Sequence, residues 1–158
     1  MALPPAGAVA PKHLGMRVFW LIFLCHLGLA MHAKYSVDGD EPHYLIVAES
    51  LLRDGDMNLA NNYARDDGAR FGRSGVPPAS HVRTELRGQL YPVHDIGLPI
   101  LLVPVVAVAR GLSELVPDAV LARLKQSRGL FAYSLIAMMM MALCSGCEIG
   151  RASCRERV

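Results

Sequence analysis

The sequence is poor in aromatic residues and carries no strong charge of either sign. Only 6% of its 158 residues are Phe, Trp or Tyr, and 16 Lys and Arg against 14 Asp and Glu give a formal net charge of +2. This balance does not support a basic nucleic-acid-binding arm or an acidic disordered chain. Apolar residues are plentiful, at 53% of the chain with a mean hydropathy of +0.30. They gather in blocks separated by a polar stretch, which favours a membrane protein over a single globular core.

Cysteines are few and show no metal-binding or disulfide pattern. The chain has four of them, and none has a histidine at zinc-ligand spacing. Cys144-Ser-Gly-Cys147 matches C-x-x-C but lacks a second pair and a strand-then-helix context. Asp54-Gly-Asp56 begins like a calcium loop, yet the sixth position is Leu59 where an EF-hand needs Gly. We therefore predict no defined metal ligand and no certain cofactor, with a divalent cation left open.

The last eleven residues resemble a translated sequencing artefact. Residues 148–158 read EIGRASCRERV, and one frame of the common short-read sequencing adapter encodes these residues in this order. Because an eleven-residue match is hard to reach by chance, we predict that this tail is adapter-derived and has no function. We then expect the natural protein to continue beyond about Cys147 and this piece alone to be inactive.

Three apolar blocks predict transmembrane helices, at residues 16–33, 96–109 and 130–147. The first block fits either a spanning helix of about 20 residues or a signal peptide with an apolar region of about 7–15. Its poor cleavage pattern and the later blocks favour an uncleaved helix, with a secreted protein as an alternative. The predicted fold class is an all-α integral membrane protein with about three transmembrane helices, the last of them truncated.

Charge placement predicts how such a protein would be oriented. The head at residues 1–15, with the adjoining Arg17, has no acidic residue, and the connection at 110–129 has four basic residues against two acidic ones. Both are expected in the cytoplasm of a cell with a bacterial-type inner (plasma) membrane. The stretch at 34–95 has seven basic and ten acidic residues. We expect it to form a long extracytoplasmic loop.

This loop is expected to contain one juxtamembrane amphipathic helix. Pro42 suits the first turn of a helix, and Leu45, Ala48 and Leu52 recur at helical spacing. Asp54-Gly55 ends the pattern, so the helix is predicted over about 42–53. It is too short and polar to cross a membrane, and we expect it to lie along the surface with its apolar side facing lipid or the other spans.

Three carboxylates, Asp38, Asp40 and Glu41, precede this helix. Acidic residues cap helices and suit the positive end of the helix dipole, and Asp38 with Glu41 has capping-box spacing. A carboxylate at the membrane boundary can equally serve as a general base that takes a proton from an acceptor hydroxyl. The residues alone leave both interpretations open.

The order of these features resembles the GT-C superfamily of membrane glycosyltransferases, which includes protein O-mannosyltransferases and lipid A aminoarabinose transferases. The resemblance is carried by Asp40-Glu41, by Tyr44 and by the return segment at 88–99, GQLYPVHDIGLP. It implies a polyprenyl-phosphate sugar as donor, an acceptor on the outer face of the membrane, and Asp40 as the catalytic base, with Glu41 as runner-up. The expected partners are the lipid-linked donor and membrane lipid, without nucleic acid.

Further residues are expected to bind substrate. Arg83 and Arg87 can pair with a lipid-linked phosphate, and His94 lies where the loop is expected to return to the membrane. With Asp38 and Tyr44 they complete the candidate substrate-binding set. The alternative is a non-enzymatic membrane protein, such as a transporter or assembly-factor piece, in which the acids only cap the helix.

Overall fold

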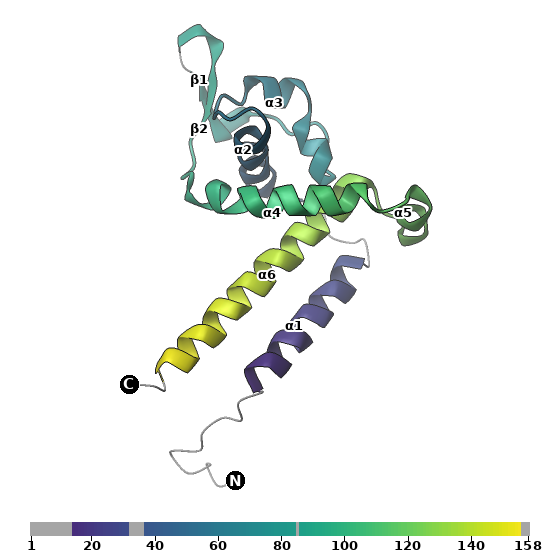
Figure 1. Ribbon diagram of the computed structural model, residues 1–158. Coiled ribbons are helices and arrows are strands. Elements are labelled where there is room, and N and C mark those ends of the chain that lie inside the picture. Colours follow the sequence, from purple (N-terminus) through teal and green to yellow (C-terminus); the bar gives the residue numbers. More distant parts are fainter. Residues whose placement is uncertain (1–13, 32–36, 85, 156–158) are drawn as a thin grey trace.

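The computed structural model describes residues 14–31, 37–84 and 86–155, and it is mostly helical (Figure 1). The α-helices are α1 (Leu14–Met31), α2 (Glu41–Arg53), α3 (Ala60–Ala64), α4 (Gly97–Glu114), α5 (Asp118–Leu124) and α6 (Arg128–Arg155). Three short 3-10 helices, η1 (Asp67–Phe71), η2 (Ala79–His81) and η3 (Leu86–Gly88), lie between α3 and α4. Two strands, β1 (Val82–Thr84) and β2 (Leu90–Pro92), pair antiparallel.

Helix α4 divides the molecule into two parts (Figure 1). On one side, α2, α3, η1 and the β1–β2 hairpin form a folded unit, which we call the α2 unit (residues 37–95). On the other side, α1 and α6 run side by side away from α4 and contact each other. The α2 unit therefore rests on α4 and on the first part of α6, which also contacts η1.

The main core lies where α2, α4 and α6 meet. Each helix contributes apolar residues three or four positions apart, which is the spacing that places side chains on one face of a helix. The buried members are Val37, Leu45, Ala48, Phe71, Leu102, Val105, Val106, Ala109, Tyr133 and Ile136. A buried ion pair crosses the same region, because Arg110 Nη1 lies 2.5 Å from Glu49 Oε1 and the Glu49 side chain is fully buried.

The prediction of an all-α membrane protein with about three transmembrane helices is wrong. Among the described residues, one helix, Gly97–Glu114, is long and apolar enough to cross a membrane. A second would follow only if α5 and the part of α6 up to Cys144, bent by 75°, were one broken span, and Met16–Cys25 of α1 forms a shorter apolar helix. The apolar block of α4 instead packs into a core against α2 and α6. Composition does not distinguish a core helix from a spanning helix of the same length.

The predicted loop at 34–95 is also different from expectation. It contains a β-hairpin, so the fold is not all-α, and α2 is the buried centre of the α2 unit rather than a helix on a membrane surface. Leu45 and Ala48 lie in the main core, whereas Leu52 is exposed. The reason is that α3, η1 and the hairpin cover sides of α2 that local periodicity would leave open.

Element boundaries differ from the predicted segments. Helix α4 extends beyond 96–109 into the segment at 110–129, which also contains α5. Helix α6 begins before 130 and continues through Arg155, into the tail at 148–158. Most of the predicted head at 1–15 lies outside the described residues, as do 32–33 and 156–158.

Candidate functional site

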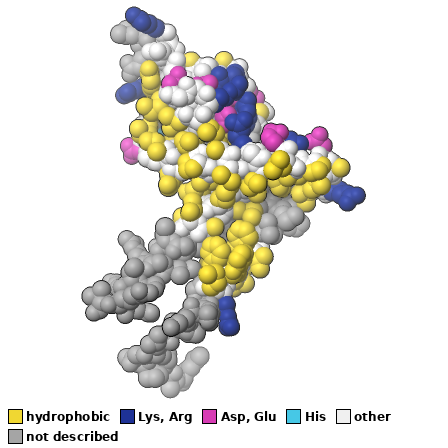
Figure 2. Space-filling view, in the orientation of Figure 1, with side chains coloured by type: hydrophobic (Ala, Val, Ile, Leu, Met, Phe, Trp, Pro, Cys, Tyr) yellow, Lys and Arg dark blue, Asp and Glu magenta, His cyan; other side chains and the backbone are white. Residues whose placement is uncertain are grey.

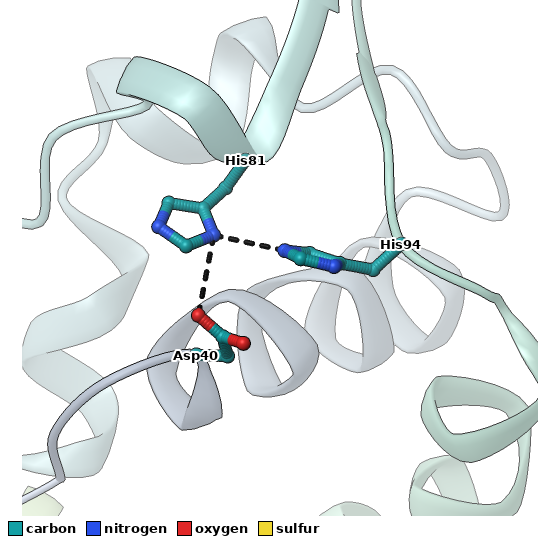
Figure 3. Close-up of side chains that lie close together, drawn as sticks. All are labelled: Asp40, His81 and His94. Atoms are coloured by element: carbon teal, nitrogen blue, oxygen red, sulfur yellow. Dashed lines mark hydrogen bonds and ion pairs between the residues drawn. The ribbon is translucent and has the colours of Figure 1, made fainter.

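The β-hairpin brings two histidines together that are 13 residues apart in sequence. His81 precedes β1 and His94 follows β2, and the pairing continues past the strands because the Val93 N–H donates to the His81 carbonyl at 3.1 Å. The loop that joins the two strands runs from Thr84 to Leu90 and includes Arg87 and Gly88, both at positive φ, 77° and 74°. As a result His81 Nδ1 and His94 Nε2 lie 2.9 Å apart (Figure 3).

Asp40 approaches the same histidines from the first turn of α2. It occupies the N-cap position, but its side chain makes no capping hydrogen bond. Its Oδ1 lies 3.6 Å from His81 Nδ1, and the side chain is 56% exposed. Figure 3 shows the carboxylate directed toward His81 from the end of the helix. An exposed carboxylate beside two imidazoles is equipped to accept a proton or to bind a cation.

A third histidine supports this group from the interior. His43 is buried and its ring stacks on that of His81, with centroids 3.6 Å apart. Burial, with a smaller contribution from the neighbouring His81, lowers the pKa of His43 to about 4, and burial raises the pKa of Tyr63 to about 12. Both groups are therefore neutral near pH 7, and the Tyr63 hydroxyl can donate to His43 Nδ1 across their 2.7 Å contact.

The other two acids have different surroundings. The Tyr133 hydroxyl of α6 donates to Glu41 Oε2 at 2.7 Å, so Glu41 connects α2 to α6. Asp38 Oδ1 accepts the N–H of Gly39 at 2.9 Å and lies 4.0 Å from Arg73. The Glu41 carboxylate thus bonds a side chain on another helix, and the Asp38 carboxylate bonds the adjacent backbone. Neither contact is the reciprocal pair of a capping box.

Two hollows flank the first turn of α2. One is a cleft of about 500 Å³ with polar and apolar lining, and the other is an apolar hollow of about 210 Å³. The cleft is lined by Asp38, Gly39, Pro42, His43, Arg73, Ser74, Gly75, Val76, Pro77 and His81. The hollow is lined by Glu41, Tyr44, Leu45, Leu98, Leu102, Tyr133, Ile136, Ala137 and Met140.

The candidate residues from the sequence fall into two groups. Asp40 and His94 lie together with His81, and the ring of Tyr44 lies 5.4 Å from that of His94. Arg83 is on β1, two residues after His81, and Arg87 is in the loop at the far end of the hairpin. Among the lining residues of the cleft that the structure describes, the arginine is Arg73.

Sequence reasoning missed His81, Arg73 and Tyr63. The relation of His81 to His94 depends on a hairpin whose strands have only three residues each, so no usable signal for it was present in the sequence. Arg73 and Tyr63 had no local signal, since their positions depend on how η1 and α3 pack. No protein-family model, curated protein or solved structure matches this chain. The function is therefore argued from the site itself.

Proposed function

We propose that these residues supply the catalytic carboxylate of a bacterial inner-membrane glycosyltransferase. The enzyme transfers a sugar from a polyprenyl-phosphate carrier to an acceptor on the outer face of the membrane. Asp40 takes the proton of the acceptor hydroxyl while that oxygen attacks the anomeric carbon of the sugar. The bond from this carbon to the phosphate oxygen breaks, and polyprenyl phosphate leaves.

The observation that carries the proposal is the state of the Asp40 side chain. A carboxylate that only caps a helix would accept a backbone N–H of the first turn. The Asp40 carboxylate makes no such bond, remains more than half exposed and faces the histidines. This geometry favours a chemical role over the alternative in which the acids of a non-enzymatic protein only cap α2.

The two hollows beside α2 support an amphiphilic substrate. A polyprenyl-phosphate sugar has a polar head and a long apolar chain, and it needs surfaces of both kinds close together. The cleft provides polar groups, including Arg73, which can pair with a phosphate. The hollow on the other side of the same helical turn is lined mainly by apolar side chains of α2, α4 and α6.

Exposed apolar side chains support a location at a membrane. Monomeric soluble proteins rarely leave a large contiguous apolar patch open. Here Trp20, Leu21 and Leu24 of α1 are all more than half exposed, as are Ile100 and Leu101 of α4. Figure 2 shows hydrophobic side chains along the lower side of the molecule, whereas charged side chains lie mainly over the upper part. Lipid contact with this lower side would bring the α2 unit to the membrane boundary.

The test is the Asp40→Asn variant of the complete protein encoded by the natural gene, assayed in membranes. Radiolabelled polyprenyl-phosphate sugars are the donors, and loss of label from the lipid is measured. Because Asn keeps the shape of Asp but cannot accept the proton, we expect the transfer rate to fall by about 10² or more. Folding should change little, since the side chain is exposed and makes no capping bond.

The matched control is Glu114→Gln, which neutralises another exposed carboxylate at the end of α4. It should transfer at the normal rate. Glu41→Gln tests the runner-up, because the Gln amide oxygen can still accept the Tyr133 hydroxyl but cannot act as a base. Its transfer rate should therefore stay near normal if Asp40 is the base. Transfer by Asp40→Asn at the rate of the control would remove Asp40 from the catalytic role.

A further inference from the structure

Three side chains beside α2 place potential metal-binding atoms close together. They are Asp40 Oδ1, His81 Nδ1 and His94 Nε2, and all lie within 4.8 Å of one another (Figure 3). They come from two separate parts of the chain, the first turn of α2 and the two ends of the hairpin. We propose that Asp40, His81 and His94 form a binding site for a divalent transition-metal ion of the Zn²⁺ type.

Two of the three separations between these atoms are close to those around a shared ion, and the third, Asp40 to His94, is within 4.8 Å. A tetrahedral Zn²⁺ with ligand bonds of about 2.0–2.2 Å holds its ligand atoms about 3.3–3.6 Å apart. The His81 to Asp40 separation is 3.6 Å and the His81 to His94 separation is 2.9 Å. The first is too long for a good hydrogen bond but close to the spacing of two ligands on one ion. Adjustments of a few tenths of an ångström in the two close pairs would bring both to that spacing.

The surroundings of the three residues hold the ligands in place. Both histidines are half-buried, and the backbone pairing of the hairpin fixes the distance between them. One face of the His81 ring stacks on the ring of His43, whose Nδ1 is bonded to Tyr63, and the Nδ1 edge of His81 stays directed at the proposed ion. The Leu90 backbone anchors the hairpin, because its N–H donates to the Asn58 side chain and its carbonyl accepts the Leu59 N–H. The histidine ligands therefore lie on a hairpin held in place by backbone hydrogen bonds, as a preorganised metal site requires.

The donor set determines the class of ion. Two imidazole nitrogens and one carboxylate oxygen suit Zn²⁺, Co²⁺ or Fe²⁺, whereas Mg²⁺ and Ca²⁺ prefer oxygen ligands alone. Three protein ligands also leave at least one coordination position for water or another oxygen, as in catalytic rather than structural zinc sites. Asp40 is exposed at this point, so that position faces solvent.

Metal binding does not rest on the proposed glycosyltransferase activity. A carboxylate that binds an ion through one oxygen keeps its second oxygen, so Asp40 can be a ligand and still accept a proton. Loss of transfer in Asp40→Asn without any metal binding would support the first proposal and overturn this one. Metal binding without sugar transfer would support the metal site and overturn the proposed glycosyltransferase activity.

The experiment titrates the purified, metal-free chain with Co²⁺ and records the visible ligand-field absorption, followed by displacement with Zn²⁺. We expect one Co²⁺ per chain with the intense absorption of a four-coordinate site, complete displacement by Zn²⁺ and none by Mg²⁺. His81→Ala, His94→Ala and Asp40→Asn should each weaken Co²⁺ binding by about tenfold or more, because each removes one ligand.

His26→Ala is the matched control, because it removes a histidine from α1, outside the proposed site. It should bind Co²⁺ as the unaltered chain does, and far-UV circular dichroism should show that all variants keep their helical content. Absence of saturable Co²⁺ binding in the unaltered chain would overturn the proposal. So would equal binding by the three ligand variants, or equal weakening by the control.

Discussion

A glycine at the start of α6 sets how closely that helix approaches η1. A Cβ added at Gly129 would lie 2.3 Å from the Ala69 carbonyl oxygen and 2.7 Å from the Gly72 nitrogen, where ordinary contacts begin at 3.4 Å. Both neighbours are backbone atoms, so they cannot rotate away as a side chain would. In Gly129→Ala, the start of α6 must therefore move away from η1 by roughly 1 Å, the difference between 2.3 Å and 3.4 Å.

The expected magnitude follows from two opposing effects. Alanine in a helix is favoured over glycine by about 0.5–1 kcal/mol, whereas overpacking of a tight contact costs about 1–3 kcal/mol and occasionally more. Because the overlap is with backbone on the far side, we expect overpacking to dominate and the free energy of unfolding to fall by about 2 kcal/mol. For a chain of this length that lowers Tm by about 4–8 °C, measured by circular dichroism at 222 nm.

Gly111→Ala is the matched control, since Gly111 lies inside α4 and an added Cβ meets nothing within 4 Å. It should raise the free energy of unfolding by about 0.5–1 kcal/mol. The same Gly→Ala change is thus expected to lower the free energy of unfolding at position 129 and to raise it at position 111. A Gly129→Ala chain that melts at or above the temperature of the unaltered chain would refute the close approach of α6 to η1.

Two further predictions concern buried charges. Arg110→Met removes the 2.5 Å partner of the fully buried Glu49 carboxylate and leaves the more distant Arg70, at 3.8 Å. It should cost about 3 kcal/mol in urea unfolding, the low end for a broken buried pair, and Glu49→Met with Arg110→Met should recover most of this loss; a double variant no more stable than the single one would contradict this. Hydrogen bonds from Arg65 hold the pKa of Asp54 below its usual value, and for Asp67 such bonds outweigh the raising effect of burial. Both pKa values are lower in the folded state, so the two ionised carboxylates stabilise the fold above about pH 4, and this stabilisation is lost as the pH falls further. The urea midpoint of unfolding should therefore drop toward about pH 3. The drop should be smaller in Asp67→Asn.

Local signals were sufficient for the helix predicted over 42–53. Pro42 at the start, the apolar spacing and Asp54-Gly55 at the end are all properties of the segment itself, and α2 spans Glu41–Arg53. What the segment could not reveal is its burial. Glu49 and Ser50 read as the polar side of a surface helix, yet both are fully buried because Arg110 and Asp56 supply their partners.

The predicted count of about three transmembrane helices failed for a related reason, which α4 illustrates: it is the one described helix long and apolar enough to span a membrane, yet one side of it packs in the core. Hydrophobicity records that a surface leaves water, not whether lipid or protein replaces it. Leu102, Val105 and Val106 face α2 and α6, whereas Ile100 and Leu101 are exposed on the same helix. Both groups contribute equally to hydropathy, so the sequence alone could not separate them.

The hairpin was missed because its strands have only three residues each. A run that short gives no measurable alternation, and the strands are joined by a five-residue loop instead of a two-residue Asn-Gly or Asp-Gly turn. With the hairpin missed, His81 had no visible relation to His94, and neither had a relation to Asp40. The candidate site was therefore only partly predictable, since one of its sides depends on a contact between distant segments.

The neighbouring acids Asp40 and Glu41 have different partners because of helix geometry. Successive residues of an α-helix point about 100° apart, so Asp40 and Glu41 at the start of α2 face different neighbours. Asp40 meets the hairpin at His81, and Glu41 meets α6 at Tyr133. A one-residue shift of the helix start would place Glu41 where Asp40 now meets the histidines and turn Asp40 away from them. The first turn of α2 thus fixes which acid is available for chemistry and which one fastens the α2 unit to α6.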